Sequence, residues 1–285
     1  MPGLLTFTSD FGITDSYVAE VKGVLKALDP ELHIIDITHW LEPGNLTAAA
    51  FVLLHAFRYF AAGTVHLAVI DPGVGSERDI LAVRTGRYVF VGPDNGILQE
   101  AVEADGGGSI FALEIECFFK KLSSLYRGND VLQRIVKQGP SATFHGRDLF
   151  APLSAYLCGG HPLEEVAVQK SSMVEYRIMR PMVCEDSVTG KVVYIDRFGN
   201  LITNVEENLV GQEDEIFLKT DRTMTLVGRL KNSYASAGRG APIAIIGSRG
   251  LLEIAVSGGS AQAQFEADYG NDILVMKKQN GGLWI

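Results

Sequence analysis

Apolar and polar positions follow two different patterns in the first half of the chain. Short apolar runs predict three strands, at 4–9, 33–37 and 64–71. Longer runs predict two helices, over 17–28 and 46–60. The first helix is expected to be capped by Thr14 or Asp15. Strands that alternate with helices are typical of a layered α/β fold with a largely parallel sheet.

Between residues 80 and 160 the pattern is less regular, and 105–140 is the hardest stretch to assign. Two neighbouring β-type runs predict a hairpin, at 80–84 and 87–92. A short helix is expected after the turn at 93–96. Further on, the pattern indicates a strand at 109–114 and helices at 129–136 and 149–157.

After about residue 170 the helical patterns disappear. Short β-type runs separated by Gly, Asn and Asp follow, at 191–195, 201–205, 215–219, 224–227, 243–246, 251–256 and 273–276. They predict an all-β domain, in the form of a small barrel. The boundary falls within 170–188. We therefore expect an N-terminal α/β domain over 1–175 and a C-terminal β-barrel domain over 186–285.

Composition narrows the classes of partner. The 285 residues are 47% hydrophobic and 21% charged, which is ordinary for a globular chain that can bury a sizeable core. A net charge of −9 disfavours nucleic acid and anionic lipid as partners. No apolar run approaches the ~20 residues of a membrane span, and no signal-like segment opens the sequence. The three cysteines share no CxxC spacing, so a reducing, cytoplasmic setting is expected.

One turn concentrates polar side chains between two apolar runs. It reads DPGVGSER over 71–78 and has Asp71 at one end and Arg78 at the other. Ligands of open α/β sheets bind beside the carboxyl ends of the strands, which makes this carboxylate and guanidinium candidates for chemistry. A surface salt bridge across a glycine turn is the alternative.

Three other loops carry candidates. Asp10, in TSDFG (8–12), follows the first strand, where a carboxylate can bind two ribose hydroxyls or cap a helix. His145, in FHGRD (144–148), stands at a helix entrance and can orient or deprotonate a water, or be structural. YIDRFGN (194–200) predicts a hairpin turn in the β domain, which need have no other role. The remaining histidines show no clustering typical of metal ligands, so a metal site is not expected.

Together with GSRGLLEIAV (247–256), these motifs resemble in order those of the S-adenosylmethionine hydroxide adenosyltransferases, relatives of fluorinating and chlorinating enzymes. The resemblance spans essentially the whole chain. It implies an N-terminal α/β domain, a C-terminal β-barrel and a homotrimer with sites between one subunit's N-domain and its neighbour's C-domain. It also implies hydrolysis of S-adenosyl-L-methionine (SAM) to adenosine and L-methionine, with no cofactor and no metal.

The resemblance also implies roles for individual residues. It assigns a water-activating triad to Asp71, Arg78 and His145. The positions implied in substrate binding are Asp10 at the ribose, Asp15, Asp196, Ser248 and Arg249 near the methionine end, Phe198, Asn200 and Tyr234 around adenine, and Val256. The halogenases differ, with Tyr at the position of Asp71 and Tyr-Ser at that of His145-Gly146. They also carry an extra N-domain loop, to which 105–125 here shows no specific match.

The implied chemistry is consistent with these residue types. A sulfonium carries its own leaving group, because breaking C5′–S expels a neutral thioether. What remains is to position and activate a nucleophile. Arg78 can stabilise hydroxide character, while Asp71 and His145 can hold the water and accept its proton. Halide attack on the same carbon and a non-catalytic SAM or adenosine sensor are the alternatives.

Overall fold

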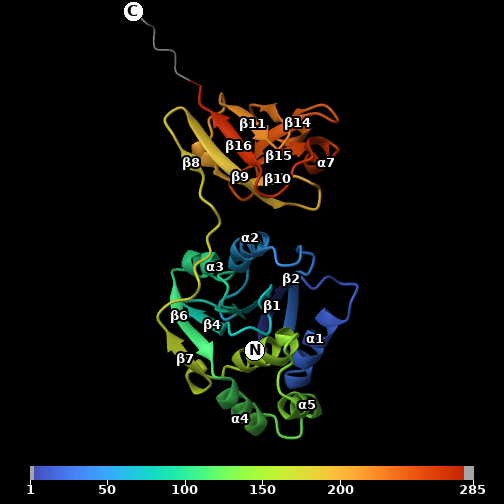
Figure 1. The fold of residues 1–285 in the computed structure, drawn as a ribbon, viewed down its shortest axis with the longest axis vertical. Coiled ribbons are helices and arrows are strands. Elements are labelled where there is room, and N and C mark those ends of the chain that lie inside the picture. Colours follow the sequence, from blue (N-terminus) through green and yellow to red (C-terminus); the bar gives the residue numbers. More distant parts are fainter. Residues whose placement is uncertain (1–2, 279–285) are drawn as a thin grey trace, which may run out of the picture. The chain divides into compact units, whose positions relative to one another are not determined.

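The computed structural model describes residues 3–278, and the chain divides into two compact units, Met1–Arg177 and Ile178–Ile285. Unit 1 is an α/β domain and unit 2 is built almost entirely of strands (Figure 1). Among the described residues, no helix is long and apolar enough to cross a membrane. Cys117, Cys158 and Cys184 are free thiols.

Unit 1 is organised around one mixed sheet of seven strands. They are β1 (Leu4–Ser9), β2 (His33–Thr38), β3 (Val65–Val69), β4 (Ile80–Thr85), β5 (Val89–Pro93), β6 (Gly108–Leu113) and β7 (Ala167–Lys170). Their order is β2-β1-β3-β5-β4-β6-β7. The β2-β1-β3-β5 half is parallel, whereas β4, β6 and β7 pair antiparallel. The prediction of a largely parallel sheet therefore holds for one half only, because the hairpin β4–β5 reverses the chain.

Helices cover both faces of this sheet. They are α1 (Tyr17–Leu28), α2 (Leu46–Ala56), α3 (Gln99–Ala104), α4 (Ile115–Leu125), α5 (Asp130–Gln138) and α6 (Ala151–Cys158). Leu5 and Phe7 of β1 join the main core with α1, α4, α5 and α6. α2 packs against α3 and β1 but contributes nothing to that cluster, which places it over the other face. Alternate β1 side chains thus serve two layers of core.

Three helix boundaries differ from the sequence prediction. The helix expected over 46–60 ends at Ala56 and is followed by a 3₁₀ turn, Phe57–Tyr59. Ser16, not Thr14 or Asp15, occupies the N-cap of α1, and its hydroxyl donates to Glu20 Oε1 (2.6 Å) instead of capping a backbone N–H. The helix expected at 149–157 is preceded by a single π-helical turn, Gly146–Phe150. Such turns recur at functional sites because they displace a side chain from the regular helical path.

Unit 2 is a strongly curved sheet that nearly closes. Its strands are β8 (Met182–Val183), β9 (Ser187–Ile195), β10 (Leu201–Glu206), β11 (Glu215–Lys219), β12 (Met224–Gly228), β13 (Leu230–Lys231), β14 (Pro242–Ile246), β15 (Leu251–Val256) and β16 (Asp272–Met276). The order is β12-β11-β16-β9-β10-β15-β14-β13, with β8 beside β9. β12 packs near β14, so the sheet is barrel-like around its own core. A five-residue helix, α7 (Ala261–Phe265), is too short for the sequence pattern to reveal.

Candidate active site

The structure brings Asp71, Arg78 and His145 into one hydrogen-bonded group. Arg78 Nε donates to Asp71 Oδ1 (2.5 Å), and Arg78 Nη2 donates to Asp71 Oδ2. The same Nη2 also lies 3.0 Å from His145 Nδ1. Only 9% of the Arg78 side chain and 5% of the Asp71 side chain are exposed. A bidentate, nearly buried pair of this kind is strong and fixed in orientation, unlike a surface salt bridge.

Sheet register explains why a second carboxylate reaches this group. β1 and β3 are parallel neighbours, and Ser9 pairs with Val69. Asp10 follows Ser9 directly and Asp71 comes two residues after Val69, so both lie at the same carboxyl edge of the sheet. Asp10 is not a helix cap, because its Oδ2 accepts from the backbone N–H of Gly44 (2.8 Å).

His145 reaches the group because its segment is held from two directions. Gly75, at φ +82, lies so close to the carbonyl of Ala142 that a Cβ would collide with it. The loop before His145 therefore packs directly on the Asp71–Arg78 turn, and glycine is required there. On the other side, buried Asp148 accepts from the N–H of Ser141 (2.9 Å) and fixes the base of the same loop.

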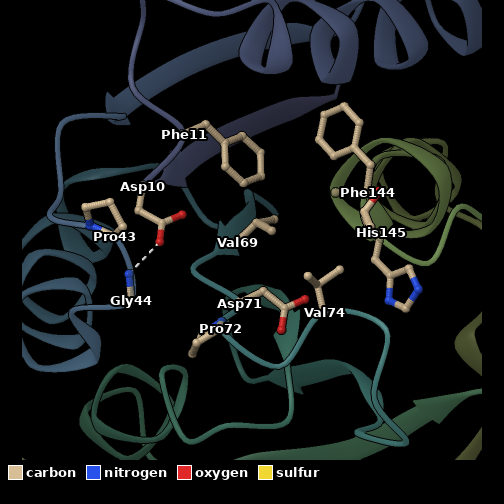
Figure 2. A pocket seen from close by; sticks show the side chains of 12 residues that line it. Asp10, Phe11, Pro43, Gly44, Val69, Asp71, Pro72, Val74, Phe144 and His145 are labelled. Atoms are coloured by element: carbon tan, nitrogen blue, oxygen red, sulfur yellow. Dashed lines mark hydrogen bonds between the residues drawn. The ribbon is translucent and has the colours of Figure 1, made fainter.

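The group borders an open pocket of ≈ 300 Å³ in unit 1, called here the unit 1 pocket. Figure 2 shows Asp10, Asp71 and His145 on three different segments around it. Phe11 and Phe144 form an apolar wall, their ring centroids 5.8 Å apart in an edge-to-face contact. The pocket thus combines carboxylates with an aromatic surface, which suits a cationic organic ligand.

The electrostatics of the group settle the form of the histidine. Burial, and then the positive charge of Arg78, lower the pKa of His145 below its usual value, so the ring is neutral at neutral pH. A guanidinium can only donate, and Nδ1 must therefore accept from it, which leaves the ring proton on Nε2. Burial raises the pKa of Asp10, and the Gly44 bond opposes that effect.

Unit 2 carries a separate pocket of ≈ 540 Å³, the unit 2 pocket, lined by Asp196, Phe198, Asn200, Tyr234 and Val256, with Gly258 beside them. Asp196 Oδ1 accepts from the N–H groups of Phe198 and Asn200 (both 2.9 Å), and its Oδ2 accepts from Asn200 Nδ2 (2.9 Å). The predicted hairpin turn is thus held by its own aspartate, which orients the Phe198 ring outward, 77% exposed.

Three predicted substrate-binding positions do not line either pocket, and neither does Arg78 of the triad. Asp15 is an exposed residue of the bend before α1. Ser248 and Arg249 are exposed in the turn before β15, where the Arg249 guanidinium lies 5.9 Å from the centre of the Tyr194 ring. Their assignment to the methionine end of the substrate stays a prediction.

Sequence reasoning missed other residues of the two pockets. Pro43 and Gly44 complete the wall beside Asp10, and the EPGN turn at 42–45 was the available signal. Buried Glu253 supports the unit 2 pocket by accepting from the Tyr234 hydroxyl (3.0 Å). A strand carboxylate that faces inward gives no pattern by which it could have been found.

Within residues 3–278, no group of three or more His, Cys, Asp or Glu side chains could hold an ion. Arg78 Nε and Nη2 already bond Asp71 and His145, whereas its buried Nη1 has no hydrogen-bond partner.

Comparisons with known proteins agree over nearly the whole chain. The model of the SAM hydroxide adenosyltransferase N-terminal domain matches residues 5–167, and that of the C-terminal domain matches 190–274. A Thermus thermophilus protein named (R)-S-adenosyl-L-methionine hydrolase is 38% identical, over 90% of this chain and 92% of its own. A fluorinase from Actinoplanes sp. is 28% identical, over 88% and 90%. An uncharacterized conserved protein from Thermotoga maritima has a solved structure with TM-score 0.82 and 33% identity, covering 96% of this chain and 100% of that one.

Proposed function

The chain belongs to the SAM hydroxide adenosyltransferase family, and on that premise we propose that it hydrolyses SAM to adenosine and L-methionine. The observation that carries the proposal is the nearly buried Asp71–Arg78 pair, bonded to half-buried His145, at the edge of a pocket that also presents Asp10. Relatives named as hydrolases are 32–38% identical, whereas the fluorinases cited among the relatives reach 26–28%. No cofactor or metal takes part.

The reaction is an in-line displacement at the ribose C5′. The water oxygen forms a bond to C5′, the C5′–S bond breaks, and its electron pair goes to sulfur as the thioether of methionine. The water loses one proton, which the Asp71 carboxylate accepts, since each oxygen keeps a second lone pair beside its bond to Arg78. Arg78 stabilises the developing hydroxide charge.

His145 has a different part from the one expected from the sequence. Its Nδ1 is occupied by Arg78 and its proton sits on Nε2, so the neutral ring donates instead of accepting. His145 therefore orients the water and Arg78, while Asp71 alone is the base. The apolar wall of Phe11 and Phe144 excludes competing water, which strengthens these interactions.

We further propose that substrate lies between unit 1 of one subunit and unit 2 of a neighbour in a homotrimer. Asp10 holds the ribose, and Phe198, Asn200 and Tyr234 enclose the adenine, with Val256 beside them. Asp15, Asp196, Ser248 and Arg249 serve the methionine end. The open shape of each pocket supports the idea that neither encloses a nucleoside alone. The exposed thiols of Cys117 and Cys184 suit a reducing cytoplasm as the location.

The reaction is tested by incubating the protein with SAM in H₂¹⁸O and identifying the nucleoside by mass. We expect adenosine with ¹⁸O at the 5′-hydroxyl. A 5′-halo-5′-deoxynucleoside formed in chloride buffer would replace hydrolysis with halogenation. SAM that stays bound and unchanged would instead identify a sensor.

The shared site is tested by mixing two variants, assayed at SAM concentrations below KM, where a loss of kcat and a loss of binding both lower the rate. Asp71→Asn damages unit 1 and Asn200→Ala damages unit 2, so neither homotrimer has an intact site. Trimers reassembled from both contain interfaces in which an intact unit 1 meets an intact unit 2, and activity should return. If each site lay within one chain, mixing would restore nothing. Light scattering on the 30.9 kDa chain measures the trimer directly.

A further inference from the structure

The turn that carries the triad spans an unusual gap in the sheet. It leaves β3 and enters β4, but these strands are not neighbours, because β5 lies between them. The turn has two backbone–backbone bonds of its own: Val74 N–H donates to Asp71 O (3.2 Å), and Ser76 N–H donates to Gly73 O (3.1 Å). The Ser76 hydroxyl adds a bond to Gly73 O (2.7 Å). A loop that passes over a strand end needs support from that strand.

The segment after β5 supplies this support at both ends of the turn. Asn95 Nδ2 donates to the carbonyl of Ile70 (2.8 Å), the residue directly before Asp71. The backbone N–H of Asp94 donates to the carbonyl of Asp79 (3.0 Å), directly after Arg78. Two consecutive residues thus hold the two flanks of the triad turn.

The last residues of unit 1 in turn hold this segment from outside. Val174 N–H donates to Asp94 Oδ1, and Tyr176 N–H donates to Gln99 Oε1 (both 2.7 Å). Gly96, at φ +86, lies so close that a Cβ there would collide with Tyr176. The segment 174–176 is therefore seated on the loop 94–99, and glycine permits the approach.

We propose that Asn95 is a positioning residue for the reaction, setting the Asp71 carboxylate through the Ile70 carbonyl, and that segment 174–176 holds the loop that carries Asn95. The inference rests on the proposed function, since it takes Asp71 as the base. Because a displacement of about 1 Å at a reacting group can cost roughly 10²-fold in rate, a loosened Ile70 carbonyl should lower kcat without abolishing binding.

The decisive variant is Asn95→Asp. It keeps the size of the side chain and the oxygen that accepts from Ile97 N–H (3.2 Å), but replaces the donor to Ile70. Asn129 gives a matched control, because its Nδ2 donates to Ala27 O (2.7 Å) and its Oδ1 accepts from Leu132 N–H (3.0 Å), far along the chain at α5. Asn129→Asp makes the same chemical change away from the turn.

We expect Asn95→Asp to lower kcat by about 10- to 100-fold while KM changes less than about threefold. Amide exchange at Val74 and Ser76 should accelerate. Asn129→Asp should leave kcat and this exchange at the parent values. Gln99→Ala, which removes the acceptor of the Tyr176 N–H, should lower kcat severalfold.

Parent kcat and parent exchange in Asn95→Asp would overturn the inference, as would equal losses in Asn129→Asp. Parent kcat in Gln99→Ala would remove segment 174–176 from it. If the parent protein forms no adenosine from SAM, the proposed function fails. The exchange comparison between the two Asn variants then still decides whether Asn95 holds the turn.

Discussion

The two pockets are built by opposite means. In the unit 1 pocket, functional side chains bond to one another and are almost wholly buried, as Arg78 does with Asp71 and His145. In the unit 2 pocket, the polar side chain Asp196 bonds within its own turn, and the Phe198 ring it supports is exposed. Unit 1 therefore holds charged groups in a fixed arrangement before any ligand arrives. In unit 2 the face of the Phe198 ring is exposed, so its burial contributes stabilisation only when a ligand binds against it.

This difference predicts that unit 1 substitutions act on rate and unit 2 substitutions act on binding. A group whose interaction exists only in the transition state lowers kcat and kcat/KM together, whereas uniform binding raises KM alone. The variants that follow test that division, beginning with the largest expected effect.

The largest effect should come from the Asp71–Arg78 pair. Asp71→Asn and Arg78→Ala should each lower kcat by about 10²- to 10⁴-fold, and the double variant should be little worse than the worse single one. Steady-state kinetics with SAM measures this. Arg84→Ala is the control, since it breaks an exposed Arg–Glu164 pair on β4 and should leave kcat unchanged. A rise in KM alone for the Asp71 or Arg78 variants would remove the distinction between the pockets.

Asp10 should be the exception within unit 1. Asp10→Ala should weaken adenosine binding by about 5- to 150-fold, because two ribose hydroxyls lose a buried acceptor, which costs about 1–3 kcal/mol. The effect on kcat should be smaller. Calorimetric titration with adenosine tests this, with the exposed carboxylate variant Asp36→Ala as control. Unchanged adenosine binding would mean that Asp10 has only a structural role, through its hydrogen bond with the Gly44 N–H.

Acid should weaken unit 1 before unit 2. All six histidines precede residue 162, and His66 lies fully buried against Phe90 with its pKa lowered to about 4 by burial. The unfolded chain binds this proton near pH 6.5 and the folded one does not, so stability falls as pH drops from about 6.5 towards 4. The loss should reach about 2 kcal/mol at pH 5.

Urea unfolding at pH 7 and pH 5, followed by amide exchange in each unit, measures this loss. His66→Gln keeps a hydrogen-bond partner for Thr6 and should flatten the acid dependence of unit 1. Equal acid sensitivity in the two units would contradict the assignment to His66.

The smallest effect should come from Tyr234→Phe in unit 2. The change removes a hydroxyl that donates to buried Glu253 but keeps the ring of the pocket wall. Adenosine binding should weaken by about two- to fivefold, in line with a net loss of ~0.5–1 kcal/mol for one hydrogen bond. kcat should stay at the parent value, as it should in the exposed-residue control Tyr59→Phe. A loss of kcat without a change in adenosine binding would show that Tyr234 acts on rate, which would contradict the division between the two pockets.

The sequence predicted those features that depend on residues close together in the chain. Apolar periodicity located most strands and helices, and the glycines between Asp71 and Arg78 indicated a turn at a strand end. The antiparallel half of the unit 1 sheet was not predicted. The place of a hairpin in the strand order depends on contacts with strands that are distant in sequence. The cap of α1 escaped because Thr14, Asp15 and Ser16 are all suitable caps and side-chain contacts decide among them.

The sequence predicted the charged residues of the site but not the residues that hold them in position. Motif order pointed to Asp71, Arg78 and His145, yet nothing local indicates that His145 Nδ1 accepts from Arg78. Asn95 and Glu253 act through contacts with residues 25 and 19 positions away in sequence, and such contacts follow from the folded sheet alone. Asp15, Ser248 and Arg249 rest on resemblance, since they do not line either pocket.

The glycine after His145 constrains how this pocket could be redesigned. A Cβ at Gly146 would lie 3.1 Å from the Phe11 ring, closer than side chains normally approach. Installing the Tyr-Ser pair of the halogenases here would therefore meet Phe11 first, and the order of substitutions matters. A laboratory lineage selected for halide use should acquire a smaller or displaced residue 11 before it tolerates serine at 146. Until residue 11 changes, Phe11 therefore favours retention of water as the nucleophile in this lineage.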